Sequence, residues 1–254
     1  MLRRRGSGSS SSRGRGRTQR SDEKEREIPP GAVCAAPVGG MSPSLRVSWR
    51  LAWGDPGFRV RFVLTVPALV AVLAGLTRFL EGIERRPGVV LPDPVLASLP
   101  PRDLTWLIFA MIYLGLLAGV TWLVPRPRRL VLALQAYVVM VVLRIAAMWA
   151  VPLEAPEGML PLNDPLVRLF GPGKILTKDL FFSGHTSTLF LLALAVTAPR
   201  WRALFLACAA GVGFCVLWQH VHYTIDVLAA PPFAYASWRI AERLGGSRSV
   251  GDGA

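Results

Sequence analysis

The sequence predicts an all-α membrane protein, a bundle of six transmembrane helices. Hydrophobic residues make up 52% of its 254 residues, and the mean hydropathy is +0.41. The apolar residues also form runs that can cross a hydrocarbon core, which takes about 20 helical residues. Arginines recur in the short connections between these runs, as is typical of membrane proteins with a fixed orientation.

The beginning of the chain differs in composition from the rest. The first twenty residues are rich in arginine and serine and contain no acidic residue, so they cannot bury an apolar core. We therefore predict a disordered basic tail and lead-in over residues 1–58, with Met41 as an alternative start. The segment shows no secretory signal and lacks the apolar face of a transit peptide.

Six apolar segments follow, and each is predicted to be a membrane-spanning helix within a domain over residues 59–243. Their expected bounds are 62–80, 104–124, 130–151, 180–198, 203–221 and 222–240. The second segment contains no charged residue, whereas the sixth contains Pro231 and Pro232, which should break or kink it. Residues 244–254 are expected to be a flexible tail.

Arginine positions predict the orientation of these helices. Basic residues lie in the N-terminal tail and within residues 126–129, 200–202 and 239–248, which six crossings place on one side of the membrane. The positive-inside rule assigns that side, with both termini, to the cytoplasm. The fourth and sixth segments then begin on the exoplasmic side. The net charge of +13 is explained by helix orientation and anionic headgroups, so no nucleic-acid partner is expected.

The three histidines of the chain lie at the starts of these two segments. His222 and Asp226 are four residues apart, so on a helix they share a face, and the carboxylate can orient the imidazole as a nucleophile or base. His185 follows Ser183 and Gly184 near a helix start, where free N–H groups suit a phosphate. This pattern predicts one site where a phosphate is attacked and released. The alternative is that these histidines only form hydrogen bonds between helices.

Other polar residues near the same membrane edge have two interpretations each. Arg144 lies about 10 Å inside the end of the third segment, where a charge must be paired or hydrated; it either binds phosphate or forms a structural ion pair. Asp179 either contacts a cationic headgroup or caps the fourth helix. Tyr223 is an interfacial anchor or part of a site for a quaternary ammonium. His220 points away from His222 and is a bystander or a supporting group.

The two histidine segments resemble conserved motifs of the sphingomyelin synthase family, part of the wider type 2 phosphatidic acid phosphatase (PAP2) superfamily. Residues 179–186, Asp-Leu-Phe-Phe-Ser-Gly-His-Thr, resemble its third motif, and residues 222–227, His-Tyr-Thr-Ile-Asp-Val, resemble its fourth. Two fainter matches are residues 91–93 to the first motif and residues 144–148 to the second. The resemblance covers roughly residues 60–240.

This resemblance implies six membrane spans of PAP2-like type and an exoplasmic active site. His222 would attack the phosphorus and form a phosphohistidine, Asp226 would orient it, and His185 would protonate the leaving lipid alcohol. The residues expected to bind substrate are Arg144, Asp179, Ser183, Gly184, Tyr223 and Lys178. No metal ion or other cofactor is expected, because the chain has no cluster with metal-ligand spacing.

The predicted function is therefore transfer of a phosphate-linked headgroup, such as phosphocholine, from a phospholipid donor to a lipid alcohol such as ceramide or diacylglycerol. Lys178 replaces a glycine of the family's third motif and favours contact with an anionic phosphate over a choline-specific site. One alternative is a lipid phosphate phosphatase that releases inorganic phosphate, although Val216 stands where those enzymes carry an arginine. The other alternative is an inactive membrane scaffold or lipid-binding protein.

Overall fold

The computed structural model describes residues 45–162 and 176–245, which fall within one compact unit, Pro43–Ala254. These residues form loops, one isolated β-bridge and eight helices. The helices are α1 (Leu45–Gly54), α2 (Pro56–Ile83), α3 (Pro94–Ala97), α4 (Thr105–Leu123), α5 (Pro127–Ala150), α7 (Gly184–Ala195), α8 (Pro199–Trp218) and α9 (Thr224–Leu244). The predicted all-α class is confirmed for this part of the chain. Most of the predicted N-terminal tail and nearly all of the C-terminal tail lie outside it.

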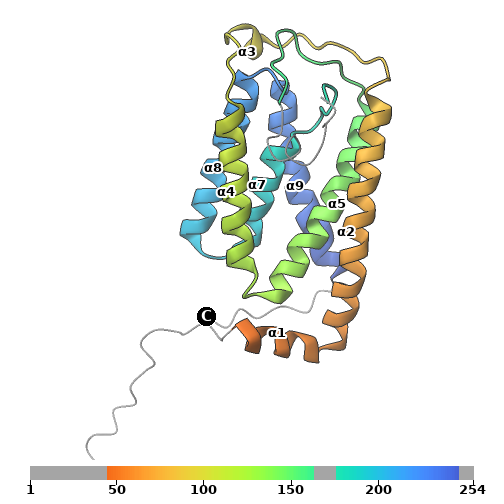
Figure 1. Ribbon diagram of the computed structural model, residues 1–254, viewed down its shortest axis with the longest axis vertical. Coiled ribbons are helices and arrows are strands. Elements are labelled where there is room, and N and C mark those ends of the chain that lie inside the picture. The colour runs from red at the N-terminus through yellow and green to blue at the C-terminus, as the bar shows by residue number, and fades with distance from the viewer. Residues whose placement is uncertain (1–44, 163–175, 246–254) are drawn as a thin grey trace, which may run out of the picture. The chain divides into compact units, whose positions relative to one another are not determined.

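Helix α1 falls inside the segment that was predicted to be tail and lead-in. Its Trp49 ring packs edge-on against Phe58 and Phe62 of α2, with ring centroids 6.3 and 6.0 Å apart. The Trp49 indole N–H also donates to the Val124 carbonyl at 2.9 Å. Figure 1 shows α1 lying across one end of the bundle. Tertiary contacts therefore order a segment whose composition alone predicts little structure.

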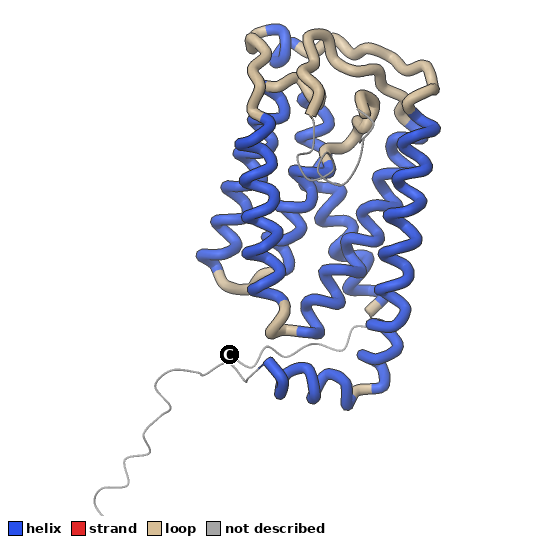
Figure 2. Tube along the Cα trace, in the orientation of Figure 1, coloured by secondary structure: helices blue, strands red, loops and turns tan. Residues whose placement is uncertain are grey.

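Each of the six predicted apolar segments overlaps one helix, in the order α2, α4, α5, α7, α8 and α9. Figure 2 shows the described part of the chain as helices joined by loops. In the described residues, α2, α4, α5 and α8 are long and apolar enough to cross a membrane, so the chain is a multi-pass integral membrane protein. Helix α7 has only 12 residues, about 18 Å of rise, and α9 is not among the candidate spans. Four candidate spans are thus shown, and the count of six remains a prediction.

Helix α9 continues through Pro231 and Pro232, so of the predicted break or kink the break does not occur. A proline inside a helix removes one backbone hydrogen bond and crowds the preceding turn. Helix α9 nevertheless packs along α5 and α7, and Ala230 and Ala234 on either side of the proline pair are fully buried. These contacts maintain a helix that local preference would interrupt.

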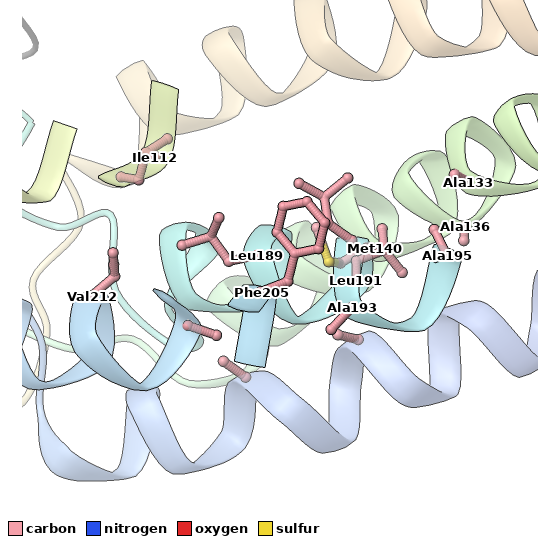
Figure 3. Close-up of a cluster of buried hydrophobic side chains, with 14 of the residues drawn as sticks. Ile112, Ala133, Ala136, Met140, Leu189, Leu191, Ala193, Ala195, Phe205 and Val212 are labelled. Carbon is pink, nitrogen blue, oxygen red and sulfur yellow. The ribbon is translucent and has the colours of Figure 1, made fainter. Parts of the chain in front are cut away.

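Helix α7 lies at the centre of the bundle, where it contacts α4, α5, α8 and α9. Figure 3 shows its Leu189 and Leu191 among side chains of the neighbouring helices, including Phe205 of α8. Helix α4 approaches closely because Gly115 and Gly119 face α7: a Cβ at Gly115 would lie 2.6 Å from Leu189. Small residues at such contacts are typical of membrane helices.

Two loops cover the end of the bundle opposite α1 (Figure 1). We call residues 84–104 the first outer loop and residues 151–162 the second. They are joined by the bridge between Val89 and Leu153, in which the Val89 N–H donates to the Pro152 carbonyl at 3.0 Å. Gly88 permits this approach, since a Cβ there would lie 2.4 Å from the Leu153 backbone.

Candidate active site

The starts of α7 and α9 meet directly. Of the two predicted catalytic histidines, His185 lies in the first turn of α7 and His222 lies two residues before α9. The Ser183 N–H, just before α7, donates to the backbone carbonyl of Asp226 in the first turn of α9 at 3.1 Å. The Asp179 carboxylate lies close enough to both His185 and His222 to interact with them electrostatically. The fold thus brings the two histidine segments together at one end of the bundle, as the arginine pattern predicts.

His222 and Asp226 form a buried pair, with exposed fractions of 1% and 0%. The His222 Nδ1 lies 3.3 Å from Asp226 Oδ2. The contact does not arise from a shared helix face, because His222 precedes α9 by two residues. Instead, Asp226 folds back in a capping box, where its Oδ2 also accepts the Tyr223 N–H at 3.0 Å. The predicted pair therefore forms through helix capping.

Arg144 enters the site from α5 and is buried, with 6% of its surface exposed. Its Nη2 donates to Asp179 Oδ1 at 2.7 Å, so the structural ion pair, the alternative interpretation of Arg144, is present, while phosphate binding stays a prediction. Its Nη1 is buried and has no hydrogen-bond partner among the described residues. The guanidinium lies against Gly184, where a Cβ would be only 2.1 Å from Nη1. Glycine is thus required for the guanidinium to reach the start of α7.

The ion pair determines the charge state of Asp179. Burial alone would raise the pKa of its carboxyl group, but the charge and hydrogen bond of Arg144 lower the pKa more, with smaller contributions from His222 and His185. Asp179 is therefore a carboxylate at neutral pH. Its side chain keeps 32% of its surface accessible, so the carboxylate lies at the edge of the site.

His185 and Ser183 occupy the first turn of α7. Ser183 is the N-cap residue and is fully buried; its Oγ accepts the Thr186 hydroxyl at 3.2 Å. His185 is partly buried, and its ring meets the edge of Phe109 from α4 with centroids 6.0 Å apart. The start of α7 thus lies beside the Arg144 guanidinium, an arrangement suited to an anion.

Lys178 and Tyr223 make their contacts with the outer loops. The Lys178 ammonium binds Glu154 at 2.8 Å and the Arg86 carbonyl at 2.9 Å. The buried Tyr223 hydroxyl donates to the Glu154 carbonyl at 3.0 Å and accepts the Leu91 N–H at 3.2 Å. Direct contact of either side chain with a substrate stays a prediction.

A set of positioning contacts was not predicted from the sequence. Residues 219–224, which we call the loop-anchoring segment, bond to both outer loops at four positions. Gln219 contacts Leu104 of the first loop and Leu160 of the second, and also Thr105 at the start of α4. His220 contacts Leu99 of the first loop and Glu157 of the second. Tyr223 contacts Leu91 and Glu154, and Thr224 contacts Asp93. His222 lies within this segment and faces inward to Asp226.

Two carboxylates outside the predicted site hold the segments that carry site residues. Asp93 accepts the Thr224 N–H at 2.7 Å and hydroxyl at 3.0 Å while it caps α3. Glu84 accepts the backbone N–H groups of Thr177 and Lys178, at 3.1 and 3.2 Å, next to Asp179. The Asp-Pro pair at 93–94 is a helix-start signal, but no sequence rule indicates its second partner.

The described residues contain no group of three or more His, Cys, Asp or Glu side chains that could hold a metal ion. Residues 178–243 match the family model described as PAP2 superfamily C-terminal. The match includes both histidines of the site and Asp226, while Arg144 and the outer loops lie before it. No curated protein matches the chain.

Proposed function

We propose that the chain is a membrane lipid phosphotransferase related to the sphingomyelin synthases, which moves a phosphate-linked headgroup between lipid alcohols through a phosphohistidine. The observation that carries the proposal is the hydrogen bond from the Ser183 N–H to the Asp226 carbonyl. It joins the two helix starts that bear His185 and His222 beside the buried guanidinium of Arg144.

The substrate phosphate would bind between Arg144 and the first N–H groups of α7. The Arg144 Nη1 is buried without a hydrogen-bond partner in the described part of the chain, and an unpaired buried donor is costly. A phosphate oxygen would satisfy it, and two donors from one guanidinium suit a phosphate. The Asp179 carboxylate, at the edge of the site, would keep the guanidinium in this orientation.

In the first half-reaction His222 would act as the nucleophile. Its Nδ1 faces Asp226 at 3.3 Å, which leaves Nε2 to attack. A phosphorus–nitrogen bond forms while the bond from phosphorus to the donor's glycerol oxygen breaks, and His185 gives that oxygen a proton. The products are diacylglycerol and a phosphohistidine that carries the headgroup.

In the second half-reaction His185, now neutral, would take the proton of the acceptor's hydroxyl group. The oxygen attacks phosphorus as the phosphorus–nitrogen bond breaks, and His222 is restored. Water in place of the lipid alcohol would give a phosphatase. Transfer is favoured by the burial of His222 and Asp226 beneath the outer loops, since exclusion of water protects a reactive intermediate.

The test is turnover by the purified full chain in lipid nanodiscs. Phospholipids of different headgroups would be supplied with and without ceramide or diacylglycerol, and the products identified by mass spectrometry. We expect a new phospholipid only when the acceptor is present. Inorganic phosphate released without an acceptor would identify a phosphatase, and no product from any donor would favour a scaffold.

The nucleophile is tested by replacing His222 with Ala, which should lower turnover by at least about 10³-fold, as for loss of a covalent catalyst. A donor labelled in its phosphate should leave acid-labile label on the wild-type protein and none on this variant. Thr77→Val, on the exposed face of α2, serves as the matched control and should turn over normally. Lipid conversion that survives in His222→Ala would refute the mechanism.

A further inference from the structure

His220 occupies a position where glycine is the usual residue. It follows the last residues of α8 with a φ of 57°, in the left-handed region. The N–H groups of His220 and Val221 donate to the carbonyls of Leu217 and Val216, each at 2.9 Å, which is the Schellman ending of a helix. This conformation is unfavourable for a residue other than glycine, because the Cβ crowds the following carbonyl oxygen. Backbone geometry therefore favours glycine, and the imidazole must contribute an interaction that offsets the cost.

The imidazole contacts two backbone carbonyls, one in each outer loop. Its Nδ1 lies 2.9 Å from the Glu157 oxygen and its Nε2 lies 2.9 Å from the Leu99 oxygen. A carbonyl oxygen only accepts hydrogen bonds, and a neutral imidazole donates from only one nitrogen. Both contacts are hydrogen bonds only if both nitrogens carry protons. In the neutral form, a nitrogen lone pair would face a carbonyl oxygen in a side chain that is only 6% exposed.

The surroundings of His220 favour a positive charge. His220 lies just beyond the carboxyl end of α8, and the negative end of a helix dipole stabilises a cation. Charged or titratable groups on the segments packed against His220 are Arg102, Asp103, Glu157, His222 and Tyr223. Of these, Arg102 lies over the Trp218 ring at 5.6 Å and Asp103 accepts the Thr105 N–H at 3.0 Å. The stabilisation comes from the two carbonyls and the helix end.

We propose that His220 is a doubly protonated bridge between the two outer loops and a positioning residue for His222. Its two hydrogen bonds fix the chain two residues before His222, while Tyr223 and Thr224 fix it immediately afterwards. The protonated bridge stands on these contacts alone. The positioning role rests on the proposed function, since it acts through the nucleophile.

The protonation state is measured directly by nitrogen NMR of the full chain in micelles, with its three histidines labelled in the ring. At pH 7.5 a free imidazole in water has largely lost its charge. We expect one histidine to keep two protonated ring nitrogens at this pH, and the same signal to be absent from His220→Gln. An unprotonated ring nitrogen on His220 at pH 7.5 would overturn the proposal.

Two variants test the positioning role. His220→Gln offers two N–H donors from one amide to the same carbonyls, whereas His220→Gly relieves the backbone cost and removes the bridge. We expect kcat to fall at least tenfold in the glycine variant with KM within about twofold, and the His222 ring signals to shift. Glutamine should restore kcat to within about threefold of wild type and leave those signals in place.

The outcomes separate this inference from the proposed function. A glycine variant that turns over as fast as wild type, with unchanged His222 signals, would refute the positioning role. If the glycine variant does not fold, the NMR measurement on the wild type and the activity of His220→Gln still decide the proposal. If His222→Ala retains turnover, the proposed function fails, while the protonation of His220 is still read independently.

Discussion

At the scale of single residues, the site depends on the missing side chain of Gly184. The guanidinium of Arg144 occupies the space that a Cβ would take, 2.1 Å from the position of Nη1. Arg144 also contacts Asp179 and is nearly buried, so it has little freedom to move aside. A residue that contributes no side chain atom thus determines where a buried charge lies.

We therefore expect Gly184→Ala to displace Arg144 from the start of α7. Overpacking of this kind costs about 1–3 kcal/mol of stability. Turnover should fall at least tenfold because Arg144, the proposed ligand of the substrate phosphate, is displaced. The matched control is Gly82→Ala in α2, which has no atom within 4 Å of the added Cβ and should be neutral or slightly stabilising. Thermal unfolding and turnover of the two variants provide the comparison, and equal behaviour would contradict this account.

The residues of the site were predictable from the sequence to different degrees. The spacing of His222 and Asp226 predicts their contact, and the depth of Arg144 predicts a partner, which the structure identifies as Asp179. How His222 comes to contact Asp226 was not predictable, because the sequence does not show that α9 begins after His222. The bonds of His220 were also missed, since both partners are backbone carbonyls of distant loops and any residue type can supply them.

At the scale of helices and loops, Asp93 joins two elements that are far apart in the chain. Its carboxylate caps α3 through the Val95 and Leu96 N–H groups and also binds Thr224 at the start of α9. One side chain thus fixes the first outer loop to the helix that carries Asp226. The cap on α3 is predictable from the Asp-Pro pair at residues 93–94, whereas the contact of Asp93 with α9 depends on the tertiary fold.

Replacing Asp93 with Ala should lower stability by about 1–2 kcal/mol, the usual cost of a lost cap, and should also reduce kcat because α9 loses its tie to the loop. Asp55→Ala is the matched control, since Asp55 caps α2 through the Gly57 N–H at 2.9 Å and has no contact with the loop-anchoring segment. It should reduce stability similarly and leave kcat unchanged. Equal kcat values in the two variants would contradict the proposed tie.

The same carboxylate predicts a pH dependence of stability. Burial tends to raise the pKa of Asp93, but hydrogen bonds from Thr224, Leu96 and Val95 lower it overall. The folded state favours the charged form of Asp93. Its contribution to the stability of the fold is therefore complete at a pH above the ordinary aspartate pKa of about 3.9, and it is lost as the pH falls through the lower pKa of the folded protein. The difference in Tm between wild type and Asp93→Asn should therefore be constant above about pH 5 and narrow below pH 4. A constant difference down to pH 3 would exclude this origin.

At the scale of the whole bundle, the two ends differ in charge. Among the described residues, the end with α1 carries many arginines and only Asp55 and Glu242 as acids, while the outer loops contain carboxylates such as Glu84, Asp93 and Glu154. The arginine pattern was visible in the sequence and predicts a cytoplasmic location for the α1 end. The number of spans was less predictable, because α7 is short and α9 contains two prolines and charged residues.

Orientation is tested by cysteine labelling in intact cells, in a background without Cys34, Cys208 and Cys215. Ser98→Cys, after α3, should react with an impermeant reagent from outside. Thr197→Cys, between α7 and α8, should react only after the membrane is permeabilised. The reverse pattern, or labelling of both positions from one side, would contradict the predicted topology.

The loop-anchoring segment has a consequence for how the outer loops can change in sequence over evolution. Most of its partners in the outer loops are backbone atoms, such as the carbonyls of Leu99, Glu157 and Leu160. Amino-acid replacements in those loops can therefore accumulate without removing the anchors, as long as the backbone path is kept. The outer surface of such a protein can therefore vary in sequence while His222 keeps its position.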